Sequence, residues 1–368
     1  MELTSAELGI RTHPGGRVYI LPCIAGHVGA DTAGVILAEE PHNATDLTLI
    51  VDVGTNAEIV LGNRDRLLAA SSPTGPAFEG AQISAGQRAA PGAIERVRVD
   101  RETLEPRFRV IGVDAWSDAP DFNAQLVAAG TGVTGICGSG IIEIVAELYL
   151  ASVITADGVI DGEVAARTPR VVADGRTFSY VLHDGHDVGP RIVVTQNDVR
   201  AIQLAKAALY AGVRLLMDQL GVEAVDEVRL AGAFGSQIDP LHAMVLGLIP
   251  DCDLARVRAA GNAAGTGALI ALLSGAARRE IERVVRQVEK IETAVEPRFQ
   301  EHFIEAMAIP HRTAANPNLE RVVSLPARPA TADRGADPRA ERRRRRAATA
   351  TAAGAATASA TSSKGDDR

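Results

Sequence analysis

The stretch Leu47–Leu61 reads Leu-Thr-Leu-Ile-Val-Asp-Val-Gly-Thr-Asn-Ala-Glu-Ile-Val-Leu. Its first five residues are apolar or β-branched, a pattern typical of a strand that is buried on both faces. A second apolar run, Ile59–Leu61, follows after a few residues. Gly54 and Asn56 both tolerate the backbone angles of a tight turn. The stretch therefore predicts two strands joined by a turn.

The predicted turn brings several polar groups together at the end of a strand. Asp52 supplies a carboxylate, Thr55 supplies a hydroxyl, and the turn exposes backbone N–H groups. This combination suits phosphate oxygens and a hydrated Mg²⁺ ion, which binds one or two carboxylates and keeps its waters. An ordinary β-hairpin with a polar turn explains the same residues. The stretch alone leaves both interpretations open.

The bulk properties limit the class of protein. The 368 residues suffice for one large domain or two smaller ones, and 46% hydrophobic but only 3% aromatic residues predict an aliphatic core. A net charge of -8 argues against non-specific nucleic-acid binding by the body of the chain. No apolar run of about 18 residues is present, so no membrane span is expected. The start of the chain lacks the features of a signal peptide, and a cytoplasmic location is expected.

The three cysteines, Cys23, Cys137 and Cys252, lie far apart and form no CxxC pair. A disulfide framework is therefore not expected. The usual four-thiolate spacing of an iron–sulfur cluster is also absent, so we expect no such cluster in this chain. Buried free thiols are the predicted state.

Two glycine-containing loops outside the opening stretch carry polar groups. The first, Ser71–Gly80, contains Pro and Gly residues that interrupt regular structure, and it carries Glu79. The second, Gly130–Gly140, opens into the apolar run Ile141–Leu150, which fits a helix. A helix N-terminus binds anions because its free N–H groups point outward. Ser139 is interpreted either as a phosphate ligand or as a helix cap, and the missing Lys excludes the Walker pattern.

The longest predicted helix spans roughly Gln196–Leu220 and begins with a capping box at Thr195 and Asp198. Lys206 lies near its middle, and it is interpreted either as a solvated residue or as a group that faces a nucleotide. A short strand, Val228–Leu230, follows this helix and leads into a glycine turn. Such a turn between a strand and a helix lets the backbone approach a planar ligand closely.

The composition changes near Asn316, where Pro, Ala, Arg, Thr and Ser begin to dominate. Residues 316–368 are predicted to form a disordered low-complexity tail, because such a segment cannot bury a core. Five arginines at 342–346 allow contact with nucleic acid or anionic lipid, but a solvated tail explains them equally. Residues 1–16 are predicted to be an N-terminal extension.

The order of these segments resembles the sugar kinase/Hsp70/actin (ASKHA) superfamily. Asp52–Asn56 is similar to its second phosphate motif, and Ala231–Gly235 is similar to its adenosine motif. Two segments rich in small residues, Ala25–Ala38 and Ala263–Leu273, resemble the connecting helices at the hinge between the two lobes. The implied fold is an α/β, ribonuclease-H-like lobe.

Longer matches point to one family within this superfamily. They resemble the C-terminal domain of the reductive activators of corrinoid proteins and comprise Leu21–Asp31, Thr74–Ala81, Gly135–Gly140 and Asp198–Ala208. The resemblance spans about residues 21–311, and residues 17–311 are predicted to form one nucleotide-binding domain. It implies an ATPase that drives reduction of a Co(II) corrinoid protein to Co(I). Electrons in that family come from a ferredoxin-type iron–sulfur domain.

The resemblance also implies cofactors, partners and a site. The cofactors are ATP and Mg²⁺, and the partners are a corrinoid protein, a separate ferredoxin-type iron–sulfur protein or domain, and a second copy in a homodimer. Asp52 would hold the metal and act with Glu79 in catalysis. The implied nucleotide contacts are Gly54, Thr55, Asn56, Gly138, Ser139, Gly140, Lys206, Gly232, Ala233, Phe234 and Gly235.

Two departures from the family pattern qualify this expectation. The chain lacks iron–sulfur cysteines, and only about twenty residues precede the first connecting helix, without an Asp-x-Gly-Thr loop. We therefore expect the second ASKHA lobe with its connecting helices, a missing first lobe, and an exposed apolar patch around Ala25–Ala38 and Ala263–Leu273. A non-catalytic interaction module and a small-molecule kinase of the same superfold are the alternatives.

Overall fold

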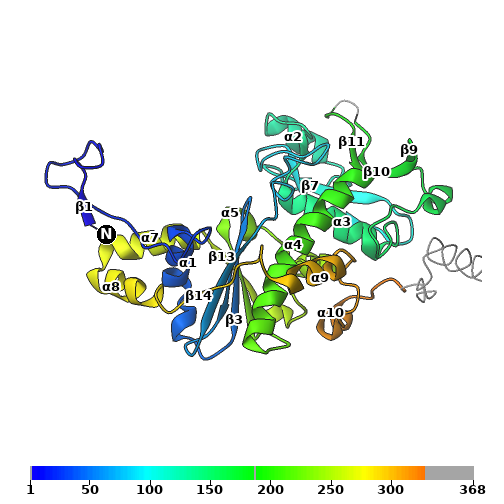
Figure 1. Cartoon of the computed structure of the whole chain (residues 1–368). Helices are drawn as coiled ribbons and strands as arrows, with labels where there is room; N and C mark the ends of the chain where they lie inside the picture. Colours follow the sequence, from blue (N-terminus) through cyan, green and yellow to red (C-terminus); the bar gives the residue numbers. More distant parts are fainter. Residues whose placement is uncertain (1, 186–187, 328–368) are drawn as a thin grey trace, which may run out of the picture. The chain divides into compact units, whose positions relative to one another are not determined.

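In the computed structural model of the protein, which describes residues 2–185 and 188–327, a six-stranded sheet lies at the centre of the fold (Figure 1). Its strands are, in spatial order, β13 (Val257–Gly261), β12 (Glu227–Ala231), β3 (Thr48–Val53), β4 (Ala57–Gly62), β5 (Leu67–Ser72) and β14 (Glu289–Lys290). The middle strands β3, β4 and β5 are antiparallel, whereas β12, β13 and β14 each run parallel to a neighbour. The two strands and the turn predicted from Leu47–Leu61 are confirmed.

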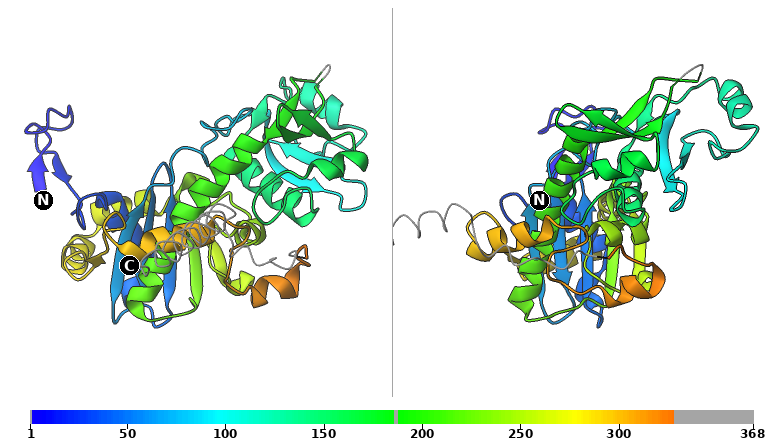
Figure 2. Two further views of the ribbon diagram at one scale, coloured as in Figure 1. Left: turned by 45° about the vertical axis from the view of Figure 1, so that its right-hand side comes forward. Right: turned by 90° about the vertical axis from the view of Figure 1, so that its right-hand side faces the viewer.

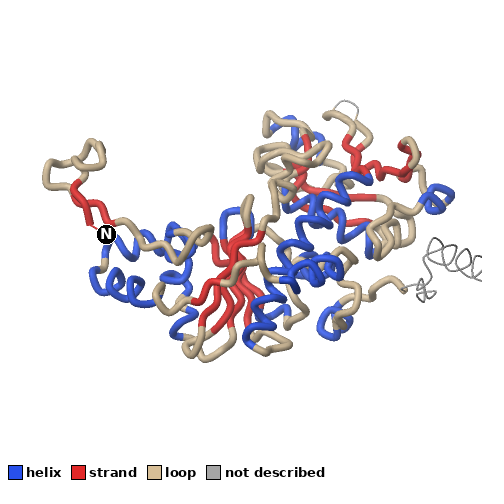
Figure 3. Tube along the Cα trace, in the orientation of Figure 1, coloured by secondary structure: helices blue, strands red, loops and turns tan. Residues whose placement is uncertain are grey.

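Helices cover both faces of this sheet (Figure 3). Helix α4 (Gln196–Leu220) packs on the face that carries Leu49 and Val51 of β3. Helices α1 (Ala30–Glu39) and α8 (Gly275–Val284) belong to the core on the other face, which carries Ile50. Successive side chains of a strand point to opposite faces, so an uninterrupted apolar strand fills two cores at once. This arrangement confirms the predicted α/β lobe.

The two helices rich in small residues pack against each other. A Cβ atom at Gly267 of α7 (Ala263–Leu273) would lie 1.9 Å from the backbone oxygen of Gly34 in α1. Because the backbones touch there, α1 is covered, with Ala33, Ile36 and other apolar residues fully buried. The predicted exposed patch is therefore wrong for α1. It is confirmed for the far side of α7, where three leucines are 54–78% exposed: Leu269, Leu272 and Leu273.

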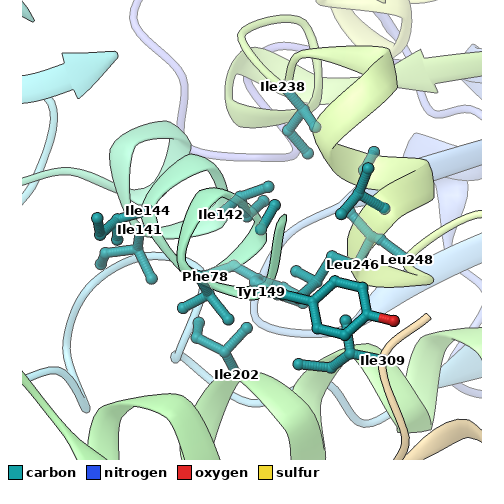
Figure 4. Packing of buried hydrophobic residues seen from close by; sticks show 14 of the residues in the cluster. Phe78, Ile141, Ile142, Ile144, Tyr149, Ile202, Ile238, Leu246, Leu248 and Ile309 are labelled. Carbon is teal, nitrogen blue, oxygen red and sulfur yellow. The ribbon is translucent and has the colours of Figure 1, made fainter. Parts of the chain in front are cut away.

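A second region of the same compact unit contains two small sheets (Figure 2). Their strands are β7 (Pro106–Val110), β6 (Ala93–Val99) and β8 (Gly135–Ile136) in one, and β11 (Ile192–Thr195), β10 (Thr177–His183) and β9 (Val171–Asp174) in the other. Helix α3 (Gly138–Leu150) is buried along its whole length against β6 and α6 (Pro240–Leu246). Figure 4 shows Ile142 and Tyr149 of α3 in the core that also receives Ile202 of α4. The long α4 thus connects the central sheet to this region.

The remaining described elements are peripheral. They are β1 (Glu2–Thr4), β2 (Arg17–Tyr19), α2 (Phe122–Ala128), α5 (Gly232–Gly235), α9 (Pro297–Ala306), α10 (Pro317–Val322) and the 3₁₀ turns Pro41–Asn43, Gly162–Ala166 and Leu254–Arg256. Strand β1 pairs with β2, so part of the predicted N-terminal extension forms a hairpin. Among the described residues, no helix combines the length and apolarity needed to cross a bilayer.

The start of the predicted disordered tail is ordered. Leu319 of α10 is fully buried, and its backbone N–H donates to Asp251 Oδ1 at 2.9 Å. The predicted boundary at residue 316 is therefore wrong for Pro317–Val322, because one buried leucine and a carboxylate cap anchor a short helix that composition did not indicate. The arginine run at 342–346 lies outside the described residues.

Candidate functional site

The predicted phosphate turn and the predicted adenosine turn lie side by side. Strands β3 and β12 are parallel neighbours, with Ala231 directly opposite Asp52. Gly232 has a φ of +87°, and a Cβ atom there would lie 2.6 Å from Asp52 Oδ1. Only glycine accommodates both that backbone angle and the close carboxylate. The structure thus brings together two motifs that are about 180 residues apart in the sequence.

Hydrogen bonds hold the turn between β3 and β4 and connect it to Glu79. The N–H of Gly54 donates to the Asn56 carbonyl at 3.0 Å. The hydroxyl of Thr74 donates to the carbonyls of Gly54 and Thr55. The Thr55 hydroxyl in turn donates to Glu79 Oε1 at 2.8 Å. Asp52, the turn and Glu79 therefore form one continuous polar surface.

Two further carboxylates join Asp52 in what we call the acidic cluster, defined as Asp31, Asp52 and Glu58. Burial and the neighbouring Asp31 raise the pKa of Asp52. Burial, together with the charges of Asp31 and Asp52, also raises the pKa of Glu58 despite a hydrogen bond from Ser71. Within the described ranges, none of the three carboxylates pairs with an Arg, Lys or His.

An uncompensated group of carboxylates fits a divalent cation. Mg²⁺ takes oxygen ligands and binds through one or two carboxylates while it keeps its waters. Burial is the main cause of the two raised pKa values, and a cation at the acidic cluster would offset the mutual repulsion of the carboxylates, which adds to it. Sequence reasoning missed Asp31 and Glu58. The register supplies a signal for one of them, since Glu58 lies directly opposite Asp52 across the hairpin.

A cavity of about 660 Å³ is lined in part by Ala233 and Phe234, the residues that follow Gly232. Its wall includes Glu79, Glu95, Gly138, Ala233 and Phe234. The rings of Phe78 and Phe234 are stacked with centroids 6.2 Å apart, which makes part of the wall aromatic. Ala233 directly follows Gly232, the residue that lies against Asp52, so this part of the wall is one residue away in the chain from the acidic cluster's contact. The volume of the cavity is typical of a small-molecule site, and its wall combines apolar side chains with polar and charged ones such as Gln87 and Arg88.

The loop before α3 contributes to this wall differently from the prediction. The Ser139 hydroxyl donates to the Glu95 carbonyl at 3.1 Å, so it is engaged inside the protein. A Cβ atom at Gly138 would lie 1.9 Å from the Phe78 carbonyl oxygen, and one at Gly140 would lie 2.4 Å from that of Ile94. Close packing explains these glycines. Gly138 and Ser139 line the cavity, whereas Gly140 is packed against β6.

Lys206 does not face the cavity, which corrects one interpretation of the sequence. Its side chain is fully buried in α4, and its ammonium donates to the carbonyls of Ala308 and Pro310. These hydrogen bonds connect the segment that follows α9 to helix α4. Lys206 therefore acts in packing, and a charge this deep is tolerated because carbonyl oxygens surround it. Gly54 and Asn56 lie in the turn between β3 and β4, Gly235 ends α5, and none of the three lines the cavity wall.

A second group of buried carboxylates lies between β6, α3 and α6. Glu143 is fully buried and accepts hydrogen bonds from the Arg96 guanidinium at 2.9 Å, from the Arg98 guanidinium at 2.6 Å and from the N–H of Val97 at 2.8 Å. His242 contacts Glu147 Oε1 at 2.7 Å through Nε2 and Asp239 Oδ1 at 2.9 Å through Nδ1. We call these six charged residues the paired cluster.

The spacing of the ligand atoms in the paired cluster would suit a metal ion, but its side chains already form a network of ion pairs with one another. Ligand atoms of Glu143, Asp239 and His242 lie within 4.8 Å of one another. Burial alone would lower the pKa of His242, but hydrogen bonds to Asp239 and Glu147 outweigh it and raise the pKa to about 9. The imidazolium and two guanidinium groups already neutralise the carboxylates, so no divalent cation is required here.

Comparisons with known proteins identify the relatives of this chain. Residues 46–320 match the family described as the C-terminal domain of RACo, the ASKHA domain, and residues 1–44 match the RACo middle region. The corrinoid activation enzyme RamQ of Eubacterium limosum is 36% identical over 313 residues, which are 83% of this chain and 49% of the relative.

Two further proteins that are similar to this chain are also described as acting on corrinoid proteins. The [Co(II) methylated amine-specific corrinoid protein] reductase of Methanosarcina barkeri is 28% identical over 244 residues, covering 63% of this chain and 40% of the relative. A solved structure of a protein described as a reductive activator for corrinoid, iron-sulfur protein has a TM-score of 0.72 and 34% identity, covering 84% of this chain and 47% of that one. The chain thus spans half or less of the length of these relatives.

Proposed function

The chain belongs to the RACo family of corrinoid activators and carries its C-terminal ASKHA domain, and from this we propose that it supplies the Mg-ATP site of a reductive activator. One observation carries the proposal. The carboxylate of Asp52, which has no cationic partner among the described residues, lies against Gly232, and the next two residues of the chain, Ala233 and Phe234, line the cavity. A metal-bound triphosphate and its nucleoside would occupy neighbouring parts of one surface.

We assign the roles by chemistry. Asp52 would hold Mg²⁺ through water, with Glu58 and Asp31 contributing charge. Backbone N–H groups of the turn would donate to phosphate oxygens, and Phe234 would pack against the base, whereas the Thr55 hydroxyl stays engaged by Glu79. Glu79, held by Thr55, orients the attacking water. ATP turnover of this type depends on positioning and on stabilisation of developing charge, and both require groups that are held before the reaction starts.

The proposed partner is a corrinoid protein. Two relatives are described as acting on corrinoid proteins, one of them on the Co(II) state. We propose that ATP binding and turnover support reduction of Co(II) to Co(I), with electrons supplied by a separate ferredoxin-type iron–sulfur protein or domain. Self-association as a homodimer and a cytoplasmic location are part of the same proposal.

Isothermal titration calorimetry with Mg-ATP tests the nucleotide site. We expect binding by the wild type and a loss of at least about tenfold in affinity for Asp52→Ala, since a tenfold change corresponds to about 1.4 kcal/mol. Asp65→Ala, which removes an exposed carboxylate from the turn between β4 and β5, is the matched control and should bind normally. No binding by the wild type, or equal binding by Asp52→Ala, would contradict the proposal.

A non-catalytic interaction module is the second candidate. The exposed leucines of α7 favour it, because a stripe of apolar side chains at the surface is typical of a contact site. ATP hydrolysis distinguishes the two functions. It should be measured with the chain alone and after addition of a corrinoid protein and an iron–sulfur donor. Activity that depends on Asp52 supports the ATPase, whereas stable binding of the partner without hydrolysis supports the module.

A further inference from the structure

Glu95 occupies a β-bulge at the cavity wall. In the pairing of β6 with β7, Ile94 lies opposite Val110 and Arg96 lies opposite Arg109. Two adjacent positions on β7 therefore face three on β6, and Glu95 is the extra residue. A bulge interrupts the alternation of side chains and redirects the residue that it contains. Here the redirected side chain is a carboxylate on the wall of the cavity.

The carboxylate of Glu95 has no partner of its own. Among residues 2–185 and 188–327, no hydrogen bond or ion pair reaches its side chain, although its backbone oxygen accepts from Ser139. Glu79, the other acidic residue of the wall, is already engaged by Thr55. The half-buried Glu95 is therefore an acceptor without a donor, and it lies on the same wall as Phe234. A ligand in the cavity can therefore donate to Glu95 without displacing a partner within the described residues.

The backbone around Glu95 is held on both sides. Before the bulge, the N–H of Cys137 donates to the Ile94 carbonyl at 3.0 Å. After it, Arg96 donates to Glu143 Oε1 and to the carbonyl of Gln237, another residue of the cavity wall. Through Arg96, the paired cluster thus fixes the bulge relative to Gln237 of the cavity wall. A group fixed before binding loses little conformational entropy when a ligand arrives.

We propose that Glu95 selects the ligand of the cavity by accepting a hydrogen bond from a hydroxyl or amino donor on the nucleoside of the bound nucleotide. The proposal rests on the proposed nucleotide-binding function and adds the residue that determines specificity. An ionised carboxylate accepts hydrogen bonds and cannot donate them. It therefore favours a nucleoside with free hydroxyl and amino groups.

Calorimetry of the full chain with defined nucleotides tests the assignment. The ligands are the Mg²⁺ complexes of ATP, 2′-deoxy-ATP, 3′-deoxy-ATP and purine riboside triphosphate, each analogue lacking one donor of ATP. The proteins are the wild type, Glu95→Ala, Glu95→Gln and the control Glu102→Ala, which changes an exposed glutamate. Thermal melting monitors the fold, and we expect no loss there because Glu95 has no partner to lose.

For ATP, we expect at least a fivefold weaker affinity in Glu95→Ala, a smaller loss in Glu95→Gln and none in Glu102→Ala. The analogue that lacks the recognised donor should bind the wild type as weakly as ATP binds Glu95→Ala, and it should lose nothing further in that variant. If a deoxy analogue shows this behaviour, the recognised donor is a ribose hydroxyl, and if purine riboside triphosphate shows it, the donor is the amino group.

Equal ATP binding by the wild type and Glu95→Ala, or additive losses for every analogue, would overturn the assignment of Glu95 alone. A wild type that binds no nucleotide would overturn the proposed function and this assignment together.

Discussion

This molecule contains two groups of three carboxylates, and the charges that surround the two groups differ. In the paired cluster, Arg96, Arg98 and His242 surround the carboxylates, and the hydrogen bonds of His242 hold the pKa of Asp239 well below its usual range, although burial opposes this. In the acidic cluster, no cation is present among the described residues, and burial raises the pKa of Asp52 and of Glu58.

The difference separates structure from function. A buried carboxylate with matched cations has its charge compensated inside the chain, and removing one partner leaves the others uncompensated. A group of carboxylates without cationic partners destabilises the free protein slightly, and it can bind a cation from solution. We infer that the paired cluster supports the walls of the cavity and that the acidic cluster binds the metal. Four predictions test this division.

The largest expected effect is that of Glu143→Ala on stability. Removing this carboxylate takes an acceptor and a compensating charge away from Arg96, Arg98 and the N–H of Val97, so the free energy of unfolding should fall by about 3–5 kcal/mol. Unfolding in urea, followed by circular dichroism, measures the change. Glu102→Ala should stay within about 0.5 kcal/mol of the wild type. A loss below about 1 kcal/mol for Glu143→Ala would show that the network does not support the fold.

His242→Gln should show a stability loss that depends on pH. Burial would lower the pKa of His242, but its two carboxylate partners raise it to about 9. A raised histidine pKa stabilises the fold fully below the unfolded value near 6.5, and the contribution is lost as the pH rises towards 9. The variant should therefore lose about 3 kcal/mol at pH 6 and clearly less at pH 10.

Urea unfolding of the wild type and His242→Gln at both pH values measures this difference, and His13→Gln in the exposed N-terminal hairpin is the control. An equal loss at pH 6 and pH 10 would mean that the charge of His242 contributes nothing and that only its packing matters.

Asp52→Asn should weaken the binding of Mg-ATP without lowering the stability of the fold. We expect the affinity for Mg-ATP to fall by more than about tenfold, or about 1.4 kcal/mol, because the amide cannot compensate the metal charge. The free energy of unfolding without Mg²⁺ should stay the same or rise slightly, since the raised pKa shows that the ionised group is unfavourable where it lies. Calorimetry and urea unfolding give the two numbers, with Asp65→Asn as the control. A marked loss of stability would place Asp52 with the paired cluster.

The smallest expected effect is that of Glu58→Gln. The amide keeps an oxygen for the Ser71 hydroxyl and removes one charge from the acidic cluster. Because the pKa of Glu58 is raised in the folded protein, its ionisation costs no stability below the unfolded value of 4.5, and the cost grows above that value until it is complete above the folded pKa. The free energy of unfolding at pH 7 should therefore rise by less than about 1 kcal/mol and should match the wild type at pH 3. A lower free energy of unfolding for Glu58→Gln at pH 7 would show that Glu58 has a cationic partner in the folded protein.

Much of the site could be predicted from local patterns. The apolar run before Asp52 predicts a buried strand, and Gly54 and Asn56 predict the turn that follows. The strand before Gly232 likewise predicts a second turn of the same kind. Both predictions succeed because a strand and its turn depend on residues close together in the chain. The family resemblance, which rests on such segments, is confirmed over residues 46–320.

The sequence by itself therefore determined the central strands, the two turns and the family of this protein. Only the tertiary structure decided which charges meet: it placed Asp31 beside Asp52, buried Lys206 under two carbonyls and surrounded Glu143 with arginines. Local periodicity reports which face of an element is buried, but the partner of a buried charge is set by packing between segments that are distant in the chain. The chemistry of a carboxylate follows from that partner, or from its absence.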